Sequence, residues 1–269
     1  MENVSRGPRT GWRWEWLAIL PGAALLVAWL YFTPSGLLGK ADAIAYAVCH
    51  RILSHSFSIE GRDFPLCARC TGMYLGAVLG LIYQSIHGRR GGMPSIKVFA
   101  VLGFFLVAFG IDGVNSYLHF FPNAPSLYQP QNWLRLVTGT GVGLGLSAVV
   151  LPAFHQTMWA NWNENRALGT WRQLGGLLVL AALLDGLVLT GNPVVLYPAA
   201  LISSAGVVTM LTMVYCMVVV MVFKRENRYI SSRQIWLPVW WGFIIAMLQI
   251  AVLDWGRFAL TGTWAGFKF

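Results

Sequence analysis

Charged side chains are scarce in this chain of 269 residues. They make up 11% of the sequence, with 10 Asp and Glu against 19 Lys and Arg, whereas a soluble domain has about 25% charged residues. Together with a mean hydropathy of +0.60, this composition excludes an ordinary soluble domain and a disordered chain. The hydrophobic fraction of 57% predicts instead a polytopic membrane protein, whose main partner is the lipid bilayer and which does not bind nucleic acid.

Cysteine is rare as well, and with only 4 such residues the chain is not a disulfide-dense secreted module. The common catalytic motifs are absent from the sequence: there is no P-loop, no Rossmann glycine run, no G-x-S-x-G elbow and no H-E-x-x-H. No internal repeat is visible, so an inverted-repeat transporter is not supported. The sequence therefore leaves open whether the protein is an enzyme.

Seven stretches approach the length that a membrane span needs, which is about 20 predominantly apolar residues. They are Trp16–Phe32, Cys70–Ile86, Ile96–Phe121, Trp133–Phe154, Leu174–Leu189, Val194–Phe223 and Ile235–Leu253. This pattern predicts an all-α, polytopic transmembrane bundle of about seven spans. The sixth stretch is long and contains Pro198, so we expect it to begin with a re-entrant or interfacial piece.

The loops between these stretches differ in basic charge, and the more basic side of a membrane protein is cytoplasmic. Twelve of the 19 Lys and Arg residues lie in the N-terminal segment or beside the loops that follow the second, fourth and sixth stretches. This predicts an N-terminus inside and a C-terminus outside, in the inner (plasma) membrane. The expected organisation is a cytoplasmic basic N-terminus at 1–15, a membrane core at 16–154 with an outer loop at 39–70, a cytoplasmic loop at 155–173 and additional membrane helices at 174–269.

Glycines at helical spacing predict close contact between two of the spans. They occupy positions 72, 76 and 80 in the second stretch and positions 139, 141, 143 and 145 in the fourth. In lipid, small residues at such spacing let helix backbones approach each other. The pattern indicates packing within one chain, and it is also compatible with a homo-oligomer or a partner membrane subunit.

The outer loop holds three of the four cysteines and two histidines. Cys49-His50 precedes the pair Cys67-x-x-Cys70, and thiolates and imidazoles are the usual ligands of structural zinc. We predict that Cys49, His50, Cys67 and Cys70 bind one ion, with His55 as the substitute for His50. Zinc is favoured for this thiolate-rich set, although copper(I) and an iron–sulfur cluster use the same soft ligands.

The same cysteines also fit a redox role. The outside of a bacterial membrane is oxidising, so Cys67 and Cys70 could cycle as a dithiol, or Cys49 could be bonded to one of them. A thiolate at the start of a helix is favoured by the helix dipole, and Arg69 would add to this effect. Cys216 lies alone in the sixth stretch and is interpreted as a packed, small apolar residue.

Three blocks of sequence carry a resemblance to a known family. The blocks are Cys49-His50-Arg51 with Phe64–Tyr74, then Asp112–Ser116, then Asn132–Gly139. Over about residues 46–147 the chain resembles the predicted prokaryotic membrane proteins that are catalogued as domain of unknown function 2085. The resemblance implies a membrane location and a sequence signature, and it implies no particular activity.

Ionisable residues inside a membrane span are costly and mark candidate functional sites. In the expected topology Asp112 and Asn115 share one face of the third span, and Arg135 and Asp185 lie at the same outer depth. We predict a polar pocket in the outer leaflet that is lined by these four residues, which are also the candidates for catalysis. Arg69 and Arg135 are candidates for binding a phosphate or carboxylate group. The alternative is that Asp112 and Arg135 form a buried ion pair that only holds two helices together.

Three classes of function remain. The first is a membrane protein with a Cys/His metal site, more structural than catalytic, beside an outer-leaflet pocket that serves a small ligand or a partner subunit. The second is a thiol–disulfide redox or electron-transfer component that uses Cys67 and Cys70. The third is a membrane enzyme acting on a lipid-linked or small anionic substrate, or an accessory subunit of a membrane complex. The metal site is the favoured hypothesis.

Overall fold

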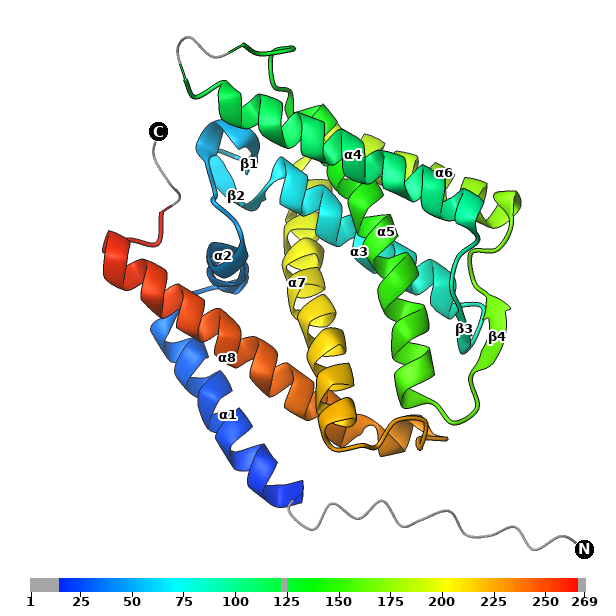
Figure 1. Cartoon of the computed structure of the whole chain (residues 1–269). Coiled ribbons are helices and arrows are strands. Elements are labelled where there is room, and N and C mark those ends of the chain that lie inside the picture. The colour runs from blue at the N-terminus through cyan, green and yellow to red at the C-terminus, as the bar shows by residue number, and fades with distance from the viewer. Residues whose placement is uncertain (1–14, 122–124, 266–269) are drawn as a thin grey trace, which may run out of the picture.

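The computed structural model of the chain describes residues 15–121 and 125–265, and this part is mainly helical (Figure 1). Nearly all of the basic N-terminal segment predicted at 1–15 lies outside the described residues. The α-helices are α1 Glu15–Phe32, α2 Leu37–Val48, α3 Ala68–Ser85, α4 Ile96–Leu118, α5 Asn132–Met158, α6 Trp171–Leu189, α7 Pro193–Val222 and α8 Trp236–Thr261.

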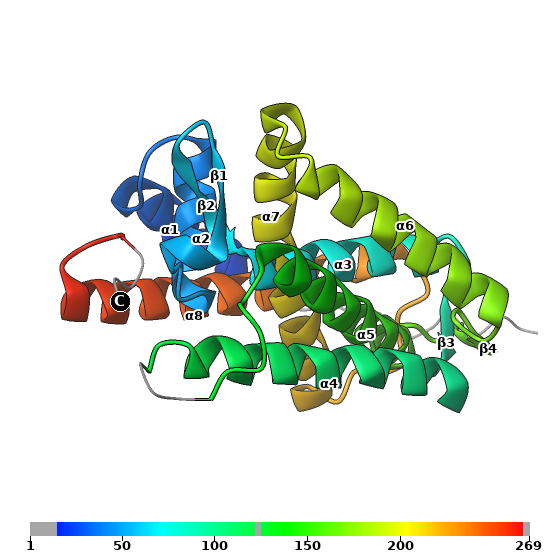
Figure 2. The same ribbon diagram turned by 90° about the horizontal axis from the view of Figure 1, so that it is seen from above.

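Two small sheets, which the sequence pattern did not predict, join the helices. The hairpin of β1 (Ser56–Ile59) and β2 (Arg62–Cys67) is antiparallel and leads directly into α3. The parallel pair of β3 (Arg90–Gly92) and β4 (Asn163–Arg166) connects two loops that are distant in sequence. Figure 2 shows the hairpin and α2 on one side of α7, and α6 on the other.

Each of the seven predicted spans falls on a helix, but the number of candidate spans is smaller. Five of the described helices are long and apolar enough to cross a membrane, namely α4 to α8, and a sixth span results if α1 and α2 count as one broken span, bent by 105°. The helix α3 is not among them, because glycines and polar side chains lower its hydropathy. The class of helical membrane protein is therefore confirmed, whereas the count of seven and the orientation stay predictions.

The expected re-entrant start of the sixth stretch is not found, because α7 is one helix of 30 residues that includes Pro198. The residues at its N-terminus explain why α7 begins at Pro193. The Asn192 side chain accepts a hydrogen bond from the Val194 N–H at 2.9 Å, and Pro193 occupies the first helical position, where its fixed φ suits a helix and its missing N–H costs nothing.

The helices α3 and α5 form the closest packing in the molecule, as the glycine spacing predicted. A Cβ added at position 72, 76, 139 or 143 would lie less than 3.0 Å from a backbone oxygen of the opposite helix. Gln84 of α3, which is 1% exposed, donates a hydrogen bond of 3.3 Å to the Ser147 hydroxyl of α5. The predicted contact between these two spans is therefore present within one chain.

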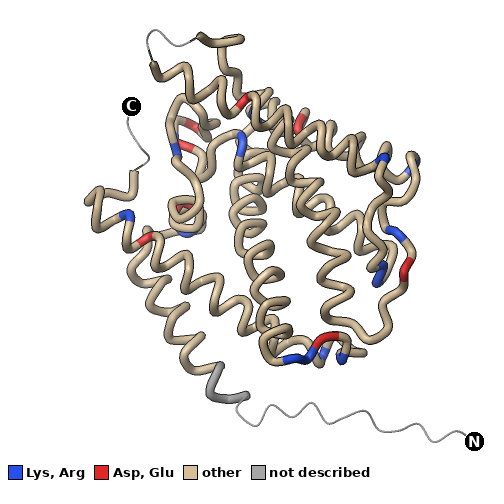
Figure 3. The backbone as a smooth tube through the Cα atoms, viewed as in Figure 1, with Lys and Arg blue, Asp and Glu red and all other residues tan. Residues whose placement is uncertain are grey.

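The connections of the bundle gather at two ends. Arg89, before β3, donates a hydrogen bond of 2.7 Å to the Ile230 carbonyl before α8, and Trp159, after α5, pairs with Tyr229. Figure 3 shows Lys and Arg along this lower and right edge of the molecule. The hairpin, the start of α5 and the end of α8 lie together at the other end (Figure 1). The loops that follow α3, α5 and α7 therefore lie near one another in the described part of the chain.

Candidate functional site

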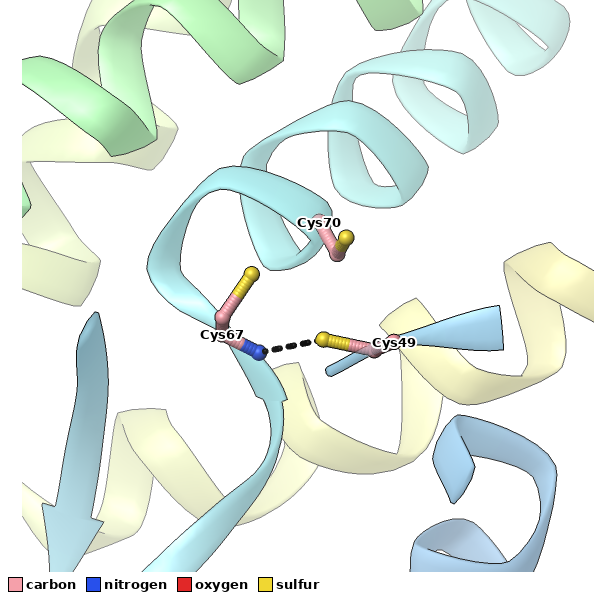
Figure 4. Close-up of side chains that lie close together, drawn as sticks. All are labelled: Cys49, Cys67 and Cys70. Atoms are coloured by element: carbon pink, nitrogen blue, oxygen red, sulfur yellow. Dashed lines mark hydrogen bonds between the residues drawn. The ribbon is translucent and has the colours of Figure 1, made fainter. Parts of the chain in front are cut away.

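Three of the four cysteines meet where α2, β2 and α3 come together (Figure 4). The Sγ atoms of Cys49, Cys67 and Cys70 all lie within 4.8 Å of one another, and none of these cysteines is in a disulfide. Cys49 and Cys67 are buried, and Cys70 is partly buried. The cluster combines residues that are 21 positions apart in sequence, so the fold rather than a local turn creates it.

Local backbone structure positions each thiol. The helix α2 ends at Val48, so Cys49 is the first extended residue after it. Cys67 is the N-cap of α3 and Cys70 follows in its first turn, where unpaired N–H groups and the helix dipole favour negative charge. The Cys67 N–H donates to the Cys49 Sγ at 3.3 Å. Two thiols are thus held at the positive end of a helix, and the third is tied to them.

The three thiols differ in acidity. Hydrogen bonds from the Cys67 and Cys70 side chains hold the pKa of Cys49 well below the ordinary thiol value, against the effect of burial. The pKa of Cys67 is raised to about 12, because its thiol donates to Cys49 and because it is buried. Cys49 is therefore the thiol that ionises first, and its neighbours would lose their protons when a cation replaces them.

A guanidinium from the far end of the chain holds the Cys49 backbone. Arg257 of α8 donates hydrogen bonds to the carbonyls of Tyr46 at 2.7 Å and Cys49 at 2.6 Å, and it lies over the Tyr46 ring. Sequence reasoning missed this residue, because the two segments are 208 positions apart. A basic residue near the end of a mainly apolar helix was the signal that could have indicated it.

Neither predicted histidine ligand belongs to the group of mutually close ligand atoms found among the described residues. The Nδ1 atom of His50 accepts a hydrogen bond of 3.0 Å from the Ile52 N–H. The His55 ring stacks on Phe120, with the ring centroids 5.4 Å apart. Burial lowers the pKa of His50 and lowers that of His55 to about 4, so both imidazoles are neutral near pH 7.

Both histidines line a cavity of about 560 Å³ beside the cysteines. Arg69 and Ser116 contribute further polar groups to it, and aromatic rings contribute apolar surface. The aromatic residues are Tyr117, Phe120 and Phe121. The cavity lies between the loop after Cys49, the first turn of α3 and the end of α4.

The buried ion pair at this end joins Asp112 to Arg69, not to Arg135 as the alternative hypothesis had it. Asp112 is 1% exposed and also accepts a hydrogen bond of 2.9 Å from the Tyr128 hydroxyl. Arg135 is 3% exposed and donates instead to Asn132 at 2.7 Å and to the Ser116 hydroxyl at 3.3 Å. Asp112 pairs with Arg69 because Arg69 lies in the first turn of α3, from which its side chain reaches Asp112 on α4.

Asn115 belongs to the same network, as its shared helix face with Asp112 predicted. Its side chain accepts from the Leu127 N–H at 2.7 Å and donates to the Tyr128 carbonyl at 2.9 Å. It thereby fixes the segment after α4, which in turn positions the Tyr128 hydroxyl. Tyr128 and Ser116 are members of the network that the sequence analysis did not single out.

Asp185 lies apart from these residues. It accepts a hydrogen bond of 2.7 Å from Thr140, and it lines a second, mainly apolar cavity of about 390 Å³ between α4, α5 and α6. Its position on α6 therefore places Asp185 at a different cavity from the one beside the cysteines. Cys216 is buried against Met158, in accordance with its interpretation as a packed residue.

A helical bundle with five or six candidate spans and a buried cysteine cluster at one end defines a polytopic membrane protein with a candidate thiolate metal site. Comparison with known proteins agrees with this class. Residues 49–149 match the family described as "Predicted membrane protein (DUF2085)", which confirms the resemblance found in the sequence. All three cysteines of the cluster and the network of Arg69, Asp112 and Arg135 lie within this matched segment.

Two archaeal proteins are similar to the same region. An uncharacterized protein of Methanothermobacter thermautotrophicus is 29% identical over 108 residues, which are 40% of this chain and 88% of the relative. An uncharacterized protein of Methanocaldococcus jannaschii is 27% identical over 118 residues, which are 44% of this chain and 70% of the relative. No solved structure gives a significant match.

Proposed function

We propose that this membrane protein binds a metal ion through Cys49, Cys67 and Cys70 at its extracytoplasmic face. The observation that carries the proposal is the mutual distance of the three Sγ atoms, at most 4.8 Å. Sulfur atoms that bind one tetrahedral zinc at about 2.3 Å lie about 3.8 Å apart. Small rotations of the side chains would therefore complete the centre.

The surroundings of the thiols favour a soft cation. Buried apolar side chains, including Ala45, Leu66 and Val207, pack around the cysteines. In such surroundings three thiolates are costly without a cation, and thiolate ligands favour zinc or copper(I) over hard cations. Zinc is the metal that we propose, because it needs no redox partner and suits a site that joins separate segments.

We propose His50 as the source of a fourth ligand, and binding the ion would require its imidazole ring to change its present position. The ring would have to give up the hydrogen bond from Ile52 and turn toward the cysteine that precedes it. If the ring stays in place, a small molecule or water would take the fourth position, as at catalytic zinc sites. His55, which stacks on Phe120, is the weaker candidate.

The role we propose for the ion is mainly structural. It would join the end of α2, the hairpin and the first turn of α3, which are also the segments that border the cavity. The extracytoplasmic location is proposed from the basic loops at the opposite end of the bundle (Figure 3). A thiol reagent that does not cross membranes, applied to intact cells after metal removal, should label Cys67 or Cys70. Labelling only after lysis would refute this orientation.

Elemental analysis of the purified full-length protein tests the metal itself. We expect about one ion per chain in the wild type, and the same in Cys216→Ser, which serves as the matched control because this cysteine lies outside the cluster. Cys67→Ser and Cys70→Ser should lose the ion. With Co²⁺ in place of zinc, His50→Ala should change the visible absorption bands if the imidazole is a ligand. A metal content near zero in the wild type would refute the proposal.

A redox function is the second candidate, and the low pKa of Cys49 favours it. Two of the three thiols would form a disulfide, and the two electrons and two protons would pass to a quinone or to a partner disulfide. Mass spectrometry of protein alkylated without prior reduction distinguishes the two functions. A disulfide within the cluster, together with no bound metal, would favour the redox function.

A further inference from the structure

The polar network beside the cavity carries one more positive charge than negative charge. Among the residues that the structure describes, Asp112 is the carboxylate of this network, and it pairs with Arg69. Arg135 is 3% exposed, and in the described part of the chain no carboxylate lies within ion-pair distance of it. A buried charge without an ionic partner is costly, so the excess charge points to an anion that is not part of the chain.

Several hydrogen-bond donors around the cavity are incompletely used. The Nε atoms of Arg69 and Arg135 are buried and have no hydrogen-bond partner. The Ser116 hydroxyl lies 3.3 Å from the Nη2 atom of each arginine, so it connects Arg69, which lines the cavity, to Arg135, which lies behind the cavity wall. Because the Nδ1 atom of His50 accepts a hydrogen bond from Ile52, its proton is carried on Nε2 in the neutral ring. The polar part of the cavity therefore offers mainly donors, which suits an oxyanion.

The rest of the cavity is apolar and reaches the surface of the bundle. Tyr117 is 63% exposed and Phe121 is 50% exposed, and both lie at or just after the end of α4, on the surface of the bundle. The rings of these two residues form an edge-to-face pair, with the centroids 5.4 Å apart. A cavity of about 560 Å³ has room for a head group and for the first part of an apolar chain.

We propose that this cavity binds an amphipathic anion, with its oxyanion head at Arg69 and Ser116 and its apolar body along Tyr117 and Phe121. The phosphate or carboxylate head is the shared chemistry, and it comes from a lipid-like molecule rather than from a free ion, because the aromatic wall gives a free ion nothing to contact. No thiol lines the cavity, and the head group is assigned to Arg69 and Ser116 rather than to His50, which is also the proposed fourth metal ligand.

A glycine in the cavity wall allows a test that leaves every charge in place. The nearest side-chain atoms to a Cβ added at Gly113 are Arg69 Nη1 at 3.4 Å and Cζ at 3.9 Å, so Gly113→Leu would fill the cavity without meeting backbone. Gly110, one turn earlier on α4, has nothing within 4 Å of such a Cβ. Gly110→Leu is therefore the matched control.

The experiment measures binding to the full-length protein in a non-ionic detergent by calorimetry and by thermal stability. The probes are dodecyl phosphate, dodecanol as the uncharged chain and inorganic phosphate as the free head group. Dodecyl phosphate should bind and stabilise the protein, and Gly113→Leu should weaken this binding by at least about tenfold, or about 1.4 kcal/mol. Gly110→Leu should bind as the wild type does.

Three results would overturn the proposal. They are equal binding of dodecanol, equal binding of inorganic phosphate, and unchanged binding of dodecyl phosphate by a folded Gly113→Leu variant. If Gly113→Leu does not fold, Phe121→Ala provides the second test, because it removes apolar wall from an exposed position and should also weaken binding. Metal content measured on the same samples should be unchanged in both variants, so failure here is distinguishable from failure of the metal proposal.

Discussion

Asp112→Asn and Arg135→Gln should have unequal effects on stability, because Asp112 pairs with Arg69 rather than with Arg135. Asp112→Asn keeps the size of the side chain but leaves two guanidinium groups without a buried counter-charge. Removing one partner of a buried pair costs about 3–5 kcal/mol. Arg135→Gln loses hydrogen bonds from a charged group to Asn132 and Ser116, each with a net worth of about 1.5–3 kcal/mol, but this loss is partly offset because the buried excess charge is removed as well. It should therefore cost only about 2 kcal/mol.

The assay is reversible unfolding of the purified protein in mixed micelles, with an ionic detergent as the denaturant and tryptophan fluorescence as the signal. A double-mutant cycle with Arg69→Gln and Asp112→Asn isolates the pair. The double variant should be more stable than the sum of the two single effects predicts, because it removes both charges together. If Arg135→Gln proves as costly as Asp112→Asn and the cycle shows no coupling, the ion pair deduced from the structure is wrong.

Three further outcomes are expected. Gly143→Leu should destabilise the protein by about 3 kcal/mol, because any side chain there meets the backbone of α3. Gly175→Leu on α6 should leave unfolding unchanged, because no atom lies within 4 Å of a Cβ added at this position. Equal effects of the two substitutions would contradict the close α3–α5 contact. Arg257→Met should weaken Co²⁺ binding by about tenfold, since it frees the carbonyl of Cys49, and unaltered affinity would show that this arginine does not position the site. The pKa of His55 is about 4 in the folded protein and about 6.5 in the unfolded chain. Between these two values only the unfolded chain binds the proton, so the free energy of unfolding should fall as the pH drops from about 6.5 to about 4. His55→Gln should flatten this pH dependence, and an unchanged slope would refute the assignment.

Much of the fold could be predicted from the sequence because its signals are local. Apolar runs placed every described α-helix except α2, and the spacing of glycines such as Gly72 and Gly143 predicted the α3–α5 contact. The count of seven spans stays a prediction, because it includes the short second stretch, which forms α3 and is not among the described helices that are apolar enough to cross a membrane. The hairpin before α3 was not predicted, since its strands of 4 and 6 residues are too short to give a clear alternating pattern.

The candidate site could be predicted only in part, because its remaining contacts join distant segments. The clustering of three cysteines followed from their shared loop, and the convergence of Asp112 and Asn115 followed from helix geometry. The choice between two arginines as the partner of Asp112 depends on how α3 is placed against α4, which no pattern in the sequence encodes. The depth of Asp185 was estimated from its span, but depth does not determine on which side of the bundle a residue faces.

The close contact between α3 and α5 has a consequence for the order of events during synthesis. The helix α3 has 18 residues and is not among the described helices that are apolar enough to cross a membrane. Gln84 donates a hydrogen bond to α5, and the backbone of α5 covers Gly72 and Gly76 of α3. The helix α5 leaves the ribosome after α3 and α4. A nascent chain that ends before residue 132 therefore lacks the helix that covers the glycines and the polar side chain of Gln84 on α3. We therefore expect α3 to enter the membrane only after α5 has been made, so that residues 68–158 insert as one unit.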